Sequence, residues 1–160
     1  MPEIERKFIL SERPPFDLDD YPSEAIRQGY IAIDPGGAEV RVRVKGDRRL
    51  LGIKSGPART RVEEEIELDE AQLDSLWPLT EGRRIEKRRY VIPTDDALSI
   101  ELDVYQGDLN GLLTAEIEFE SEDQADRFQA PGWIGTDVTG DGRYSNQTLA
   151  TDGAPEPRPG

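Results

Sequence analysis

The sequence predicts a mainly β protein of the α+β class, built from antiparallel strands with one apolar and one charged face. Three observations support this fold class: short segments in which apolar and charged residues alternate, turn-forming residues between these segments, and few segments with a helical pattern. The chain has 160 residues, which suits one domain and leaves little room for a second. We therefore expect one domain over residues 1–150.

Eight strands are predicted from the alternation and from the turn signals that separate them. The turn signals include DPGG at 34–37, KGDRR at 45–49 and QGDLNG at 106–111. The predicted strands cover residues 3–10, 24–33, 38–46, 49–55, 60–68, 83–92, 98–106 and 112–120.

Helices are predicted over residues 69–80 and 121–128, with a short one beginning near Asn146. Asp69 is a suitable N-cap for the first. Ser121 is suitable for the second, whose first turn carries acidic residues that the helix dipole favours. The Pro- and Gly-rich residues 151–160 are expected to form a disordered tail.

The composition excludes several functional classes. The chain has 20 Lys and Arg against 34 Asp and Glu, a net charge of −14, which argues against nucleic acid and against an anionic membrane as partners. It has no Cys, so disulfides and thiolate metal sites are impossible. It also has no His, the commonest metal ligand and general base. A bound metal would therefore have oxygen ligands, which favours Mg²⁺, Mn²⁺ or Ca²⁺ over Zn²⁺.

The N-terminal segment MPEIERKF lacks the apolar core of a secretion signal, and the longest apolar run is the four residues 30–33. We therefore expect a soluble cytoplasmic protein. The sequence leaves the oligomeric state open.

Charged residues of one sign cluster on single strands. In AEVRVRVKG, Arg41 and Arg43 share the face opposite the valines, and in TRVEEEIEL, Glu63 and Glu65 share one face. One explanation of this clustering is that the charged faces are simply solvated, as on an ordinary antiparallel sheet. The motif EIERK does not decide against it by itself, because such a motif arises by chance about once in a chain of this composition. Solubility is better served by interspersed signs, whereas a site that holds a polyanion with its metal cations needs clustered ones.

The alternation also matches an outer-membrane barrel, which places polar residues inside and apolar residues outside. That alternative is rejected because Arg6 and Glu64 fall on the apolar phase, and because two helices interrupt the strands.

The chain resembles the CYTH domain, also called the triphosphate tunnel metalloenzyme fold, over about residues 2–150. EIERKF resembles the amino-terminal ExExK signature of this family, and WIGTDVTGDGRYSNQTLA resembles its closing segment. Thr136 and Asp137 stand where related chains often have Arg and Glu, so the contacts of the closing segment are left open. The positions that match in order along the chain are Glu3, Glu5, Lys7, Arg41, Arg43, Lys54, Glu63, Glu65, Lys87, Arg89, Asp103, Glu116 and Glu118.

The resemblance implies a closed eight-stranded antiparallel β tunnel with a charged lumen and flanking helices. It also directs Lys87 and Arg89 inward, which the alternation of strand 83–92 leaves undecided. Six inward cations and seven inward carboxylates then give the lumen a net charge of about −1. Such a lumen must be wet, internally paired or filled by a ligand, because unpaired charges in a dry interior are prohibitive.

The resemblance further implies roles for these residues. Lys87 is expected to orient the attacking water and Glu116 to be catalytic, with metal-assisted activation of that water because the chain lacks His. One or two of the cations are expected to form structural ion pairs instead. The expected substrate-binding cations are Lys7, Arg41, Arg43, Lys54, Lys87 and Arg89. The expected ligands of Mg²⁺ or Mn²⁺ are Glu3, Glu5, Glu63, Glu65, Glu116 and Glu118.

The function expected from this site is metal-dependent hydrolysis of inorganic triphosphate to pyrophosphate and phosphate. Trp77 and Trp133 are expected to be core or cover residues, so no base-stacking element is evident. The alternatives are hydrolysis of nucleoside or thiamine triphosphates, an adenylyl cyclase that expels pyrophosphate from ATP, and a non-enzymatic polyphosphate binder.

Overall fold

The computed structural model describes residues 4–55 and 62–155. Within these two ranges, nine antiparallel strands form one sheet in the order β5-β4-β3-β2-β6-β7-β8-β1-β9. Each of the eight predicted strands is present, and β9 is an additional short one. The bounds are β1 Ile4–Ile9, β2 Ser23–Ile33, β3 Glu39–Lys45, β4 Arg48–Ser55, β5 Val62–Glu67, β6 Arg84–Pro93, β7 Ser99–Gln106, β8 Leu113–Phe119 and β9 Thr136–Asp137.

The helices begin where the sequence predicts. Asp69 caps α1 by accepting the Gln72 N–H, and the Gln72 side chain in turn accepts the Asp69 N–H. Ser121 caps α2 by accepting the Gln124 N–H. The helices are α1 Glu70–Leu76, α2 Glu122–Arg127 and α3 Asn146–Asp152, with short 3₁₀ turns η1 Leu18–Asp20, η2 Trp77–Thr80, η3 Gly107–Leu109 and η4 Gly142–Tyr144.

Helix α3 continues through residues 151 and 152, the first two residues of the predicted tail. Residues 156–160 of that tail lie outside the described part of the chain, as does Glu3.

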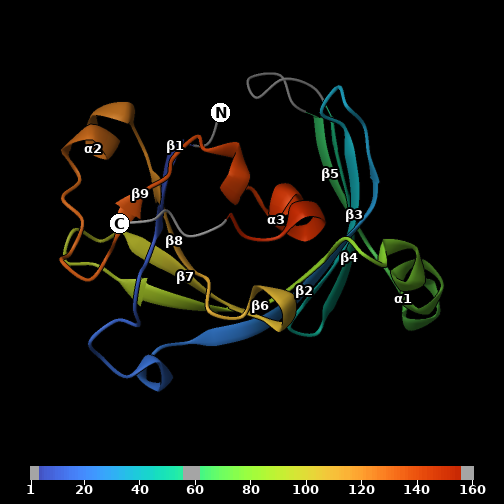
Figure 1. Cartoon of the computed structure of the whole chain (residues 1–160), viewed down its shortest axis with the longest axis horizontal. Coiled ribbons are helices and arrows are strands. Elements are labelled where there is room, and N and C mark those ends of the chain that lie inside the picture. The colour runs from blue at the N-terminus through green and yellow to red at the C-terminus, as the bar shows by residue number, and fades with distance from the viewer. Residues whose placement is uncertain (1–3, 56–61, 156–160) are drawn as a thin grey trace.

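The mainly β fold is confirmed, but the predicted closed tunnel is not. The sheet curves around α3, while β5 and β9 remain its two separate edges (Figure 1). The free edge of β1 pairs with β9, and the Val138 N–H donates to the Lys7 carbonyl, so this edge is not available to β5. Strand β5 is exposed along its whole length and carries Glu63, Glu64, Glu65 and Glu67, charges that oppose edge-to-edge pairing.

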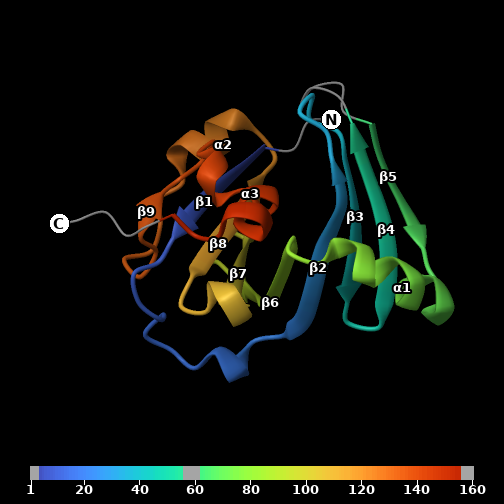
Figure 2. The same ribbon diagram turned by 45° about the vertical axis from the view of Figure 1, so that its right-hand side comes forward.

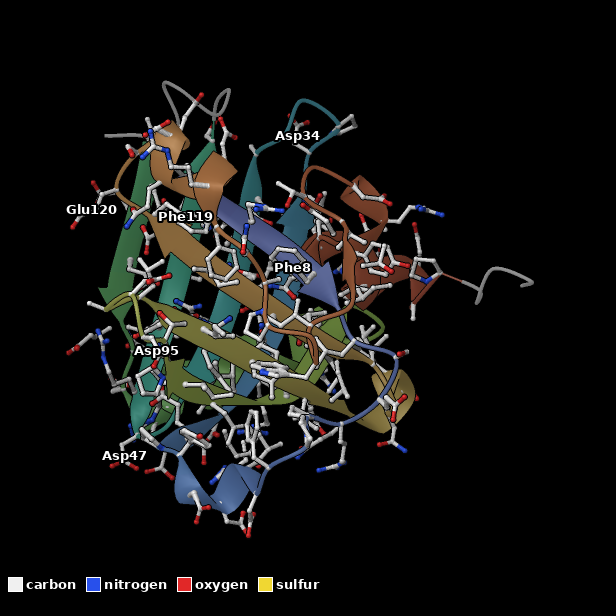
Figure 3. All side chains as sticks on the ribbon, turned by 90° about the vertical axis from the view of Figure 1, so that its left-hand side faces the viewer. Phe8, Asp34, Asp47, Asp95, Phe119 and Glu120 are labelled. Atoms are coloured by element: carbon white, nitrogen blue, oxygen red, sulfur yellow. The ribbon has the colours of Figure 1, made fainter. Side chains whose placement is uncertain are left out.

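The larger hydrophobic core covers the convex face of the sheet. Phe8, Leu102 and Ile117 are buried there, with Trp133 packed against them. In Figure 3 the labelled Phe8 and Phe119 lie on this face, on neighbouring strands. The Trp133 ring makes an edge contact with Phe16 at 5.2 Å between centroids. Trp133 is therefore a cover residue, as the sequence predicts.

A second core lies on the concave side, beneath α3. Leu149 of α3 packs with Tyr30, Ile85 and Tyr105 of the sheet. Figures 1 and 2 both show α3 between the β7–β8 side and the β2–β5 side. The helix therefore fills part of the space that the curved sheet encloses, and the charged side chains line what remains. Within the described ranges, no helix is long and apolar enough to cross a membrane.

Candidate active site

A cavity of about 1010 Å³ opens on the concave face of the sheet. Glu65 and Lys87 are described but are not part of its lining, and Lys87 is only 3% exposed. The predicted site residues that line the cavity are Glu5, Lys7, Arg41, Arg43, Lys54, Glu63, Arg89, Glu116 and Glu118.

The strand register separates the charges along the cavity wall. On one side, Lys7 of β1 pairs in register with Glu116 of β8, and Glu116 pairs with Glu101 of β7. On the other side, Lys54 of β4 lies in register with Glu63 of β5. The strands β3 and β6 between these two sides contribute mainly cations. An anion in the middle of the cavity therefore meets basic side chains, with carboxylates on both flanks.

Most of the cavity cations form ion pairs with glutamates of the sheet. The Lys7 Nζ lies 3.4 Å from the Glu116 Oε1, and the Lys54 Nζ lies 3.1 Å from the Glu63 Oε1. The Arg43 Nη2 lies 3.1 Å from Glu65 Oε2. All three pairs are partly solvent-accessible, so each contributes little stability and can exchange its carboxylate for another anion.

Arg41 differs from the other predicted cations. Within residues 4–55 and 62–155 it forms no ion pair, although it is only 8% exposed. The Nε atoms of Arg41 and Arg43 are buried and lack hydrogen-bond partners in the described structure. Buried donors without acceptors are uncommon in folded proteins. An oxyanion in the cavity would offer acceptors to both guanidinium groups.

A buried cluster of charged side chains, formed by Lys87, Asp103 and Arg89, fixes the position of Arg89 at the cavity. The Asp103 carboxylate accepts hydrogen bonds from the Arg89 Nε at 2.9 Å and Nη2 at 3.0 Å, and lies 2.9 Å from the Lys87 Nζ. Burial lowers the pKa of Lys87, against the attraction of Asp103. Burial also favours the neutral form of Asp103, but Lys87 and Arg89 outweigh it and hold its pKa below the ordinary value. Asp103 thus fixes the position of the Arg89 guanidinium. The Arg89 Nη1 lies 2.8 Å from the Glu101 Oε2, and both residues line the cavity.

The structure adds site residues that the sequence interpretation did not assign. Glu101 and Tyr30 line the cavity, and the buried Tyr30 hydroxyl accepts a hydrogen bond from the Gln28 Nε2 at 2.7 Å. The Tyr105 hydroxyl donates to the Asn146 Oδ1 at 2.8 Å and so connects β7 to α3, where Asn146 lines the cavity. The alternation along ELDVY places Glu101 on the inward face. Asn146 is expected only as the start of a helix, and nothing in the sequence marks it as a partner of Tyr105.

The closing segment has two separate roles. Asp137, one of the two departures from the resemblance, binds the Arg6 guanidinium at 2.8 Å on the convex side and does not line the cavity. Residues 138–142 and 145–147 do line it, and the Tyr144 carbonyl accepts a hydrogen bond from the Lys7 Nζ at 2.5 Å. The ion pair between Arg6 and Asp137 therefore holds the closing segment against β1. Other residues of this segment complete the cavity wall.

The carboxylates of the cavity suit a hard divalent cation only in combination with a ligand. In the described ranges, no three acidic side chains are close enough to hold a metal ion by themselves. Glu5 and Glu118 are nevertheless register partners, with Glu116 on the same face of the same strand. Mg²⁺ requires one or two carboxylates and completes its shell with phosphate oxygens and water. The donor set is therefore compatible with a metal that binds together with a phosphorylated ligand.

No family model matches the chain. Two curated relatives do, and both are named inorganic triphosphatase. The relative from Nitrosomonas europaea is 43% identical over 150 residues, which cover 94% of this chain and 97% of the relative. The relative from Acetivibrio thermocellus is 41% identical over 154 residues, which cover 92% of each chain.

Comparison of the fold with solved structures points to the same class of protein. A crystal structure described as that of an inorganic triphosphatase superposes with a TM-score of 0.79 at 39% identity, over 97% of this chain and 98% of that one. A structure from Bacillus halodurans, provisionally described as an adenylate cyclase, shares the fold with a TM-score of 0.57 at 19% identity, over 78% and 84% of the two chains. The curved sheet and its charged concave face define a protein of the CYTH, or triphosphate tunnel, class. Within that class, the chain belongs to the family of inorganic triphosphatases.

Proposed function

We propose that this protein hydrolyses inorganic triphosphate to pyrophosphate and phosphate, with Mg²⁺ or Mn²⁺ as the metal. The observation that carries the proposal is the central group of cations, in which Arg41 and Arg43 present buried Nε donors without partners and Arg89 is fixed by Asp103. The names and similarity of the curated relatives support the same activity.

The arginines bind the non-bridging oxygens of the substrate. Their planar guanidinium groups suit bidentate contacts with phosphate, whereas Lys7 and Lys54 act as point charges at the two sides of the cavity. Binding requires these lysines to exchange contact with Glu116 and Glu63 for contact with phosphate. The carboxylates released in this way become available to a cation that arrives with the substrate.

Glu5, Glu116 and Glu118 would hold the metal on one side of the cavity, and Glu63 on the other. A bound divalent metal supplies neutralisation of the phosphate charge and activation of water. Water adds to one terminal phosphorus as the phosphoanhydride bond breaks, which releases phosphate and pyrophosphate. Glu3 and Glu65 stay predicted ligands, the first outside the described residues and the second paired with Arg43.

Lys87 is proposed as a positioning residue in this scheme. Its ammonium group binds Asp103 outside the cavity lining, and Asp103 in turn binds Arg89. In the described conformation, Lys87 thus acts on the substrate through the position of Arg89. Its direct contact with the attacking water stays a prediction.

Free triphosphate is expected to be hydrolysed faster than ATP, thiamine triphosphate or pyrophosphate. Two aromatic residues, Tyr30 and Phe119, contribute to the cavity lining. Tyr30 is only 1% exposed and the Phe119 side chain packs in the core of the convex face, so neither offers a broad face to a base. Phosphate release from each compound with Mg²⁺, followed by chromatographic identification of the products, tests this preference. Formation of cyclic AMP from ATP at a comparable rate would favour the cyclase alternative.

Replacing Glu116 by glutamine is expected to raise the Mg²⁺ concentration needed for half-maximal activity by about ten- to hundredfold. The change preserves shape but removes one negative charge from the proposed metal ligands. Rates measured over a range of Mg²⁺ concentrations at saturating triphosphate test this. Glu64→Gln on the exposed β5 is the control, because it removes the same charge outside the cavity lining. A metal requirement unchanged in Glu116→Gln would remove Glu116 from the metal site.

A further inference from the structure

Gly52 interrupts the inward row of side chains on β4. It lies between Leu50 and Lys54 on the concave face, with Arg41 of β3 and Glu65 of β5 as its register partners. Its φ is not positive, so the backbone conformation does not require glycine. Glycine in the interior of a strand weakens the strand and often marks a close approach of another group. The reason for glycine at this position must therefore lie in its neighbours.

Arg41 occupies the space that a side chain at position 52 would take. A Cβ atom built on Gly52 would lie 3.3 Å from both the Cγ and the Nε of Arg41, and 3.9 Å from its Cδ. The aliphatic part of Arg41 thus lies directly against the Gly52 backbone. On the other side of Arg41, its register partner is the buried Tyr30. Arg41 therefore runs in a narrow space between these two residues.

This contact is important because the direction of Arg41 is not set by a carboxylate. The other predicted cations are each directed by an ion pair, such as that of Arg43 with Glu65, whereas Arg41 forms none in the described ranges. Packing against Gly52 and the interaction with its register partner Tyr30 must then decide where its guanidinium points. A methyl group at position 52 would require Arg41 to move by a few tenths of an ångström.

We propose that Gly52 is a positioning residue for substrate binding, because its missing side chain lets Arg41 lie against β4 and present its guanidinium to the phosphate chain. The proposal rests on the proposed triphosphate site. It assigns to Gly52 a role in affinity, exerted through Arg41, and no part in the bond-breaking step.

The test is the variant Gly52→Ala. Its KM for triphosphate is expected to rise about three- to tenfold, because small misplacements of binding groups are costly, while kcat stays within about twofold of the wild type. Its Tm is expected to be unchanged or higher, since replacing glycine by alanine reduces the conformational freedom of the unfolded chain. The control is Ile53→Val on the opposite face of the same strand, which should keep the wild-type KM.

A double-mutant cycle with Arg41→Ala separates positioning through Arg41 from other effects. If Gly52 acts through Arg41, Gly52→Ala adds no further increase of KM once Arg41 is alanine. An equal increase in both backgrounds, a wild-type KM in Gly52→Ala, or a variant that fails to fold would each overturn the proposal. Calorimetric titration with triphosphate distinguishes the two proposals. An inactive wild type that binds triphosphate, with weaker binding by Gly52→Ala, contradicts the hydrolase and retains the positioning role.

Discussion

Replacing Asp103 by alanine is expected to lower the free energy of unfolding by about 3–5 kcal/mol. Asp103 is the shared counter-ion of Lys87 and Arg89, and its side chain is only 2% exposed. Without it, two positive charges remain close together in the interior with no compensating carboxylate on that side. Urea denaturation at pH 7, followed by circular dichroism, measures the change.

Glu101→Ala is the matched control for this variant. Glu101 lies two residues away on the same strand and also pairs with Arg89, at 2.8 Å, but its side chain is 42% exposed. Solvent screens such a pair, so its loss is expected to cost no more than about 1 kcal/mol. Equal destabilisation by the two variants would contradict the interpretation that burial of Asp103 makes this cluster structurally important.

Replacing Arg41 by alanine is expected to raise the KM for triphosphate by about ten- to hundredfold, with a smaller change in kcat. One hydrogen bond to a charged group contributes about 1.5–3 kcal/mol, which corresponds to this range. The physical reason is that a guanidinium that contacts phosphate oxygens in both the bound substrate and the transition state contributes uniform binding. Initial rates measured over a range of triphosphate concentrations separate the two parameters.

Arg88→Ala serves as the control for Arg41→Ala. Arg88 lies on β6 between the inward Lys87 and Arg89, so its side chain points to the opposite face, and it does not line the cavity. Both variants lower the net charge by one unit, so a general electrostatic effect on an anionic substrate would appear in both. A large fall in kcat at unchanged KM in Arg41→Ala would instead assign Arg41 to the transition state.

The strands and the charged face could be predicted because their signals are local. Side chains alternate between the two faces of a strand, so AEVRVRVKG directs Arg41 and Arg43 to one side whatever the strand pairs with. The same alternation along TAEIEFE assigns Glu116 and Glu118 to one face. The helix starts at Asp69 and Ser121 are equally local, because each cap binds an N–H only three residues away.

Local signals could not predict which strands form the two edges of the sheet. Whether β1 pairs with β5 or with the closing segment depends on contacts between residues more than a hundred positions apart, such as that of Arg6 with Asp137. An alternating strand pattern is the same in an open sheet and in a closed one. The open edge of β5 and the place of α3 inside the curve were therefore decided by the tertiary structure.

The roles of individual cations were decided by the tertiary structure as well. With the family resemblance added to the sequence, Arg41, Lys87 and Arg89 are equivalent inward charges, because composition and phase do not reveal which carboxylate each one meets. The register places Asp103 beside Arg89 and near Lys87, and it places Gly52, which has no side chain, beside Arg41. Charge type and face are properties of a single strand and follow from the sequence, whereas counter-ions and free space belong to neighbouring strands and exist only once those strands have paired.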